Sequence, residues 1–148
     1  MFKKLKTVLI ADDSPDFLLM FKLLLAPYKL DILTAENGVL AIEILKVNAV
    51  DLIITDFQMP QINGLGVLQW CRKNDIFCPV IFVTTDAIDI KSVDIILGDC
   101  CATLLKKPMD LEVFRAALFA ADSFNHHEHC VHKSFRIAIE EAGDLPKT

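Results

Sequence analysis

The amino-acid sequence predicts an α/β protein with a doubly wound, parallel sheet of five strands and helices on both faces. Five short apolar segments alternate with five segments of helical character. The strand segments are apolar at consecutive positions, which is typical of parallel strands that are covered on both sides. The 148 residues are 53% hydrophobic and 24% charged, which is enough for one domain with a core of its own.

The first strand and helix are expected near the N-terminus. Residues 7–11 form an apolar run that predicts a buried strand. Ser14 is a favoured N-cap residue, and Pro15 suits the first position of a helix. The helix is expected over residues 16–26, where Pro27 ends it.

The second unit has a strand at residues 30–35 and a helix that opens at Asn37-Gly38. Apolar residues recur on one face of this helix: Leu40, Ile44 and Val47. A buried strand, bounded by acids, follows at residues 51–55. These two units continue the alternation that a parallel sheet requires.

The remaining elements repeat the pattern. The turn Asn63-Gly64 precedes a helix at residues 65–73. Further strands are expected at 79–84 and 103–106, and a helix between them at 88–97. The last helix, 110–121, is capped by Asp110 and carries apolar residues in step: Leu111, Phe114, Leu118 and Ala121.

The C-terminal residues depart from this alternation. They hold four histidines and one cysteine close together: His126, His127, His129, Cys130 and His132. Their spacing fits no paired zinc motif, so we interpret them as solvated side chains. Val131, Phe135 and Ile139 then recur at helical spacing, which predicts a partly helical extension over residues 125–148 and not a separate domain.

Composition excludes several function classes. The net charge of −5 argues against direct DNA binding, and no apolar run is long enough to cross a membrane. The five glycines form neither a P-loop nor a dinucleotide-binding motif. An odd number of cysteines without Cys-x-x-Cys spacing predicts free thiols in a cytoplasmic protein.

Polar residues follow four of the predicted strands. Asp12 and Asp13 follow the first strand, Asp56 follows the third, Thr84 ends the fourth and Lys107 follows the fifth. The carboxyl ends of parallel strands share one edge of the sheet, so these side chains are expected to converge there. Crowded carboxylates repel one another, which raises at least one pKa and favours a hard divalent cation such as Mg²⁺.

These residues, with Met59-Pro60, Asn63-Gly64 and Lys107-Pro108, resemble the motifs of a response regulator receiver domain. The resemblance covers about residues 5–124, so residues 1–124 are expected to form the receiver domain. It implies a flavodoxin-like sheet with strand order 2-1-3-4-5. It also implies a signalling protein of a bacterial two-component system, whose only catalysis is its own phosphorylation and dephosphorylation.

The resemblance implies a role for each acidic-site residue. Asp56 would accept a phosphoryl group from the phosphohistidine of a histidine kinase or histidine phosphotransfer protein. Asp13 and Asp56 would bind Mg²⁺ (or Mn²⁺) directly, the Gln58 carbonyl would complete the shell, and Asp12 would act through a metal-bound water. Lys107, aimed by a cis peptide bond to Pro108, would pair with a phosphoryl oxygen.

Further residues would control switching and lifetime. Thr84 would move to the phosphoryl group, and Leu104 would shift inward in place of the family's usual aromatic residue. Gln58 and Asp86 would tune attack by water. Cys100-Cys101 replaces the usual Gly-Ala pair before the fifth strand.

The resemblance also implies protein partners. The phosphodonor would dock along helix 16–26, which is apolar nearly all round, and we expect Leu18 among its exposed residues. The signal would pass to a protein effector through the face formed by residues 88–121, with homodimerisation through that face as a further expectation. The alternative is a pseudo-receiver that docks proteins without phosphorylation.

Overall fold

In the computed structural model, five strands form one parallel sheet in the order β2-β1-β3-β4-β5. The structure describes residues 2–85, 88–99 and 101–123. The strands are β1 (Thr7–Ala11), β2 (Asp31–Ala35), β3 (Leu52–Thr55), β4 (Val80–Thr84) and β5 (Ala102–Lys106). This topology confirms the predicted fold class.

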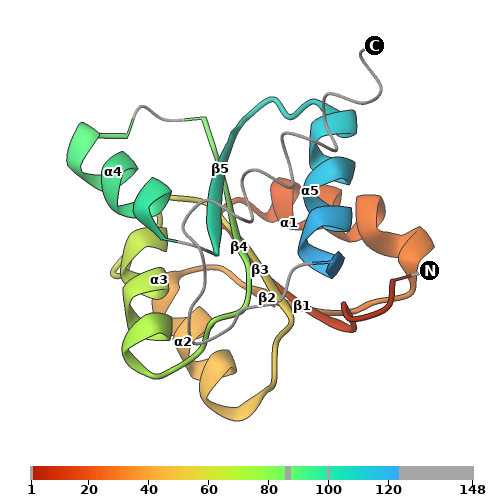
Figure 1. Ribbon diagram of the computed structural model, residues 1–148, viewed down its shortest axis with the longest axis horizontal. Coiled ribbons are helices and arrows are strands. Elements are labelled where there is room, and N and C mark those ends of the chain that lie inside the picture. The colour runs from red at the N-terminus through yellow and green to blue at the C-terminus, as the bar shows by residue number, and fades with distance from the viewer. Residues whose placement is uncertain (1, 86–87, 100, 124–148) are drawn as a thin grey trace.

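Helices cover both faces of the sheet. Helices α1 and α5 lie on one face, and α2, α3 and α4 lie on the other (Figure 1). Their bounds are α1 (Pro15–Leu25), α2 (Gly38–Val47), α3 (Gly64–Lys73), α4 (Ile90–Gly98) and α5 (Leu111–Ser123). A short 3₁₀ helix, η1 (Ala26–Tyr28), follows α1 and contains Pro27, so the proline lies just beyond the end of α1.

The central strands are covered on both faces, which explains why polar and apolar residues do not alternate along them. Every residue of β3 and β4 is buried. Ile54 packs into the core beneath α1 and α5, whereas its neighbour Ile53 packs into the core beneath α2, α3 and α4. Each strand therefore supplies apolar side chains to two cores, as a doubly covered parallel sheet requires.

Helix α2 turns a different face inward from the one that the sequence pattern indicated. Leu40 and Val47 are 46% and 81% exposed. The buried residues are Gly38, Ala41, Ile42 and Leu45. Gly38 permits this rotation, because a Cβ at that position would overlap the backbone of Ile62. Only glycine allows this face of α2 to lie so close to that backbone.

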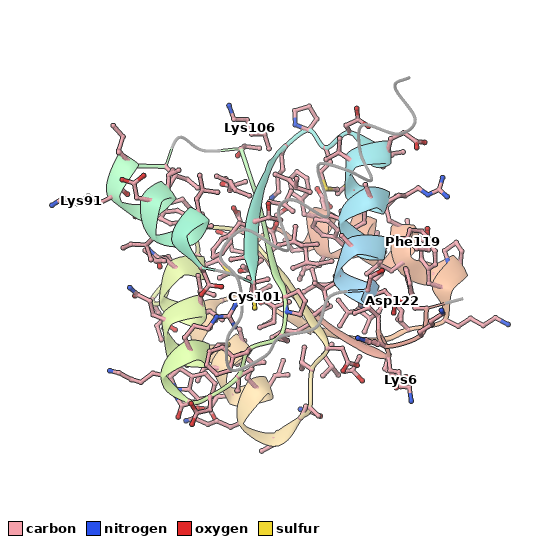
Figure 2. All side chains as sticks on the ribbon, viewed as in Figure 1. Lys6, Lys91, Cys101, Lys106, Phe119 and Asp122 are labelled. Carbon is pink, nitrogen blue, oxygen red and sulfur yellow. The ribbon has the colours of Figure 1, made fainter. Side chains whose placement is uncertain are left out.

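The C-terminal end of α5 is tied to the N-terminal segment. The carboxylate of Asp122 accepts hydrogen bonds from the backbone N–H groups of Lys3, Lys4 and Leu5, at 3.0, 2.7 and 3.0 Å. Figure 2 shows Asp122 and Lys6 at the same end of the molecule, opposite Lys106 at the end of β5. Helix α5 runs to Ser123, past its predicted end, and the predicted extension and its histidines lie outside the described residues.

Within the part of the chain that the structure describes, no helix is long and apolar enough to span a membrane. Cys71, Cys78 and Cys101 form no disulfide, as predicted, while Cys100 and Cys130 lie outside the described residues. Burial raises the pKa of Cys71 to about 11 and that of Cys78 to about 12, so both thiols stay protonated at neutral pH.

Candidate acidic site

The predicted cluster of carboxylates forms at the carboxyl edge of the sheet. Ala11 and Thr55 are register partners at the ends of β1 and β3. The Asp56 N–H also donates to the Ala11 carbonyl at 2.9 Å, which places the acids that follow the two strands side by side. One oxygen each of Asp12, Asp13 and Asp56 lies within 4.8 Å of the others.

Lys107 joins this cluster from the end of β5. Its Nζ lies 2.7 Å from Asp12 Oδ2 and 3.7 Å from Asp56 Oδ2. Its backbone N–H donates to the Thr84 carbonyl at 2.9 Å, and the Lys107–Pro108 peptide bond is cis, as the resemblance implied. The side chain is only 3% exposed, so its ammonium group is buried against the carboxylates.

Asp56 is the carboxylate whose electrostatics are most altered. Burial is the largest influence and raises its pKa, and nearby Asp12 raises it further. Lys107, a hydrogen bond from the Thr84 side chain and the Phe57 N–H act in the opposite direction on the same pKa. The predicted rise is therefore confirmed, but its main cause is loss of solvent and not repulsion between carboxylates.

The Asn63-Gly64 motif supports Asp56 from the adjoining loop. The Asn63 side chain accepts the Gly66 N–H and caps α3. The Gly64 N–H donates to the Phe57 carbonyl at 2.8 Å. A Cβ on Gly64 would overlap the Asp56 carbonyl oxygen, so α3 can begin this close to the site only with glycine at that position.

The donor set fits a hard divalent cation. The cluster holds three carboxylates, and one ammonium group contacts two of them, so the site carries an excess of negative charge. Carboxylate oxygens are the ligands that Mg²⁺ prefers, and the exposed Asp13 and partly accessible Asp56 leave room for bound water. The two oxygens of Asp12 are already engaged within the protein, because they accept hydrogen bonds from Lys107 and from the Ser14 N–H.

Thr84 and Leu104, the two residues expected to form a switch, lie on the neighbouring strands β4 and β5. Thr84 is 3% exposed at the end of β4, and its side chain contacts Asp56. Leu104 is partly buried and packs against the core beneath α2, α3 and α4. Gln58 is exposed, and Asp86 lies outside the described residues.

The segment before β5 is held by a charged pair. The Arg72 guanidinium donates to both oxygens of Asp99, at 2.8 and 2.9 Å. Asp99 also accepts the Cys101 N–H at 2.8 Å, and Cys101 is buried. No sequence pattern indicates this pairing, because Arg72 and Asp99 lie 27 positions apart.

Phe17 is a further site residue that sequence reasoning missed. Its ring lies under the ammonium of Lys107, with Nζ 3.6 Å from the ring centroid. The sequence showed only that Phe17 belongs to an apolar helix, and nothing in the helical period relates it to a lysine on the fifth strand.

The outer surface of α1 is apolar, as expected. Leu19 and Leu23 are 56% and 66% exposed, and a groove of about 520 Å³ runs along them. The groove is lined by Asp16, Leu19, Met20, Leu23 and Leu24. The expectation for Leu18 was wrong: it is 8% exposed and packs into the core beneath α1 and α5, because it lies on the inward face of the helix with Phe21 and Leu25.

Comparison with known proteins identifies related sequences. Residues 8–119 match the family model described as the response regulator receiver domain. The polar-differentiation response regulator DivK of Brucella anthropi is 30% identical over 111 residues, covering 74% of this chain and 89% of DivK. The sensor histidine kinase RcsC of Salmonella typhimurium is 29% identical over 111 residues, but the chain spans only 12% of RcsC.

A solved structure agrees with the sequence relatives. The signal receiver domain of a signal transduction histidine kinase from Syntrophus aciditrophicus superposes with a TM-score of 0.71 at 26% identity. The match covers 85% of this chain and 97% of that one. Sequence and fold therefore point to the same family.

Proposed function

Because this chain belongs to the response regulator receiver domain family, we propose that Asp56 accepts a phosphoryl group from a phosphohistidine on a partner protein. One observation carries the proposal: the Asp56 carboxylate lies among two further carboxylates, with the ammonium of Lys107 3.7 Å away. That arrangement places a nucleophile and a counter-charge for phosphoryl oxygens in one site.

In the proposed step, an oxygen of Asp56 forms a bond to phosphorus while the N–P bond of the phosphohistidine breaks. The leaving imidazole nitrogen keeps the electron pair of that bond. Lys107 pairs with a phosphoryl oxygen, and the Thr84 hydroxyl donates to another. Bound Mg²⁺ (or Mn²⁺), held by Asp13, Asp56 and the Gln58 carbonyl, would neutralise charge on the phosphoryl group.

The proposal extends to partners and domain limits. A histidine kinase or histidine phosphotransfer protein would dock on the α1 groove, and the product would signal to a protein effector in the cytoplasm. Residues 1–124 would form the receiver domain, with 125–148 as an extension. The chain would catalyse only its own phosphorylation and dephosphorylation, with Gln58 and Asp86 adjusting the latter rate.

Incubation with acetyl phosphate and Mg²⁺ tests the proposal, with intact mass as the readout. We expect a gain of one phosphoryl group that requires Mg²⁺ and is absent in Asp56→Asn. Asp13→Ala should weaken Mg²⁺ binding more than Asp12→Ala, because Asp12 is engaged by Lys107. A wild-type chain that gains no mass, or an Asp56→Asn variant that still gains it, would contradict the proposal.

The pseudo-receiver remains the second candidate because of one observation. The residue at the family's aromatic switch position is Leu104, and it lies only partly buried against the core beneath α2, α3 and α4. A chain that becomes phosphorylated without any change in shape would favour that candidate.

A further inference from the structure

The ammonium group of Lys107 lies between charge and an aromatic ring. Asp12 Oδ2 is 2.7 Å from Nζ and Asp56 Oδ2 is 3.7 Å from it. The Phe17 ring lies against the same Nζ, which is 3.6 Å from the ring centroid. Phe17 comes from α1 and Lys107 from the end of β5, so the contact joins two elements across the site edge.

Beyond the ring lies an apolar cavity of about 300 Å³. Phe17, Met20, Pro108 and Met109 contribute to its walls, and Lys107 borders it. A lysine side chain has many rotamers, and this cavity offers space into which the ammonium could turn away from the carboxylates. The cavity wall is mainly apolar and offers few acceptors for an ammonium hydrogen bond. On the α1 side, the group that attracts the Lys107 ammonium is therefore the face of the Phe17 ring.

We propose that Phe17 is a positioning residue for phosphoryl transfer, because its ring holds Lys107 Nζ at the acidic site. The inference rests on the proposed role of Asp56 as phosphoacceptor. Lys107 lies closer to Asp12 than to Asp56, so it must move towards Asp56 to pair with a phosphoryl oxygen. The attraction of a ring face is spread over the ring, so the ammonium can slide across it without breaking a directional hydrogen bond.

The test measures the rate of self-phosphorylation by acetyl phosphate at saturating Mg²⁺, using the full chain. Phe17→Leu removes the ring and should slow the reaction by about 5- to 30-fold, the range that a desolvated cation–π contact supports. Phe17→Tyr keeps a ring and should stay within about twofold of the wild type. Met109→Leu, a volume-conserving change in the same cavity wall, serves as the matched control and should leave the rate unchanged.

A series of fluorinated phenylalanines at position 17 separates positioning from packing. Added fluorine withdraws charge from the ring face while the ring keeps nearly the same shape, so the rate should fall stepwise with each fluorine. A flat fluorine series would overturn the inference even if Phe17→Leu failed to fold. A folded Phe17→Leu variant that reacts at the wild-type rate would overturn it as well. Failure of the proposed function would be recognised separately, as a wild-type chain that gains no phosphoryl group.

Discussion

Asp12 and Asp56 follow neighbouring strands, yet their side chains differ in exposure and in distance from Lys107. The Asp12 side chain is 2% exposed and hydrogen-bonds to Lys107, whereas the Asp56 side chain is 11% exposed and its Oδ2 lies 3.7 Å from the same ammonium. Asp56 therefore keeps an oxygen accessible to an incoming phosphorus atom. Both residues directly follow a strand, so their place in the sheet does not distinguish them. They differ in their distance from the Lys107 ammonium, which is closer to Asp12.

Gly64 lies against the backbone of Asp56, so a larger residue at this position should disturb the acidic site. Gly64→Ala should disturb the Asp56 backbone, because the added Cβ would overlap its carbonyl oxygen, and self-phosphorylation should slow at least tenfold. Gly98→Ala is the matched control, since an added Cβ at Gly98 has nothing within 4 Å. Acetyl phosphate kinetics and thermal unfolding of both variants provide the measurement. Equal rates in the two variants would show that the loop yields without moving Asp56.

Asp122 gives a prediction about stability and pH. Burial opposes its ionisation, but the N–H groups of Lys3, Lys4 and Leu5 outweigh burial and hold its pKa below the ordinary value. The carboxylate therefore stabilises the fold above the pKa of the unfolded chain, about 3.9, and this contribution disappears as pH falls through the folded value. Asp122→Asn should cost about 1–3 kcal/mol at pH 7 and much less near pH 3.

Urea unfolding at both pH values measures the effect. Asp31→Asn, a change at an exposed aspartate, is the control. A stability difference between wild type and Asp122→Asn that stays constant down to pH 3 would mean that charge on Asp122 is not the cause.

At the scale of elements, α1 has an inner side packed in the core and an outer side open to solvent. Leu18 and Phe21 are buried, whereas Leu19 and Leu23 are exposed. The exposed pair lines the groove along α1, and an apolar surface of this kind is typical of a partner-binding site. Helix α1 therefore packs into the core on one side and, under the proposed function, would dock the phosphodonor on the other.

Leu19→Glu should slow transfer from a phosphohistidine protein by about tenfold or more while leaving acetyl phosphate kinetics unchanged. Val47→Glu, at an 81% exposed position on α2, is the control and should slow neither route. Phosphotransfer from a histidine phosphotransfer protein and from acetyl phosphate would be followed in parallel. Slowing of both routes would indicate a damaged fold, and slowing of neither would place the docking site elsewhere.

The sequence predicted the elements better than their rotation. Strands were predictable because apolar runs such as Leu52–Thr55 end abruptly at charged residues. The inward faces of α1 and α2 were not, because both helices are apolar on several sides and periodicity then favours no single face. Tertiary contacts, such as that of Gly38 with Ile62, decide which face of the helix packs inward.

The same limit applies to the site. The acids were predictable because strand ends in a parallel sheet share one edge. Contacts that cross between elements, such as Phe17 with Lys107, depend on side-chain directions that strand order does not supply.

At the scale of the whole molecule, the proposed function requires a signal to pass from Asp56 to the face formed by α4, β5 and α5. Thr84 links the two regions, because it contacts Asp56 and ends the strand that pairs with β5. A pull on Thr84 would open space for Leu104 to move inward, which is a change between two packed arrangements.

Phosphorylation should therefore alter amide exchange within residues 84–121, with β5 becoming more protected as Leu104 packs inward. Hydrogen exchange and sedimentation of the phosphorylated and unmodified chain measure the change, and Asp56→Asn treated with the same donor is the control. Unchanged exchange together with an unchanged association state would contradict the switch and favour the pseudo-receiver.

The hydrogen bonds of Asp122 also determine how this fold can be joined to other proteins. They hold residues 3–5 and the last turn of α5 within bonding distance, so the two ends of the described fold lie side by side. A fold whose ends are adjacent can be inserted into a loop of a host protein without forcing that loop apart. A short peptide that joins Ser123 to the N-terminal segment, in place of residues 124–148, would close this fold into a ring, and new ends could then be cut in the exposed turn after α2.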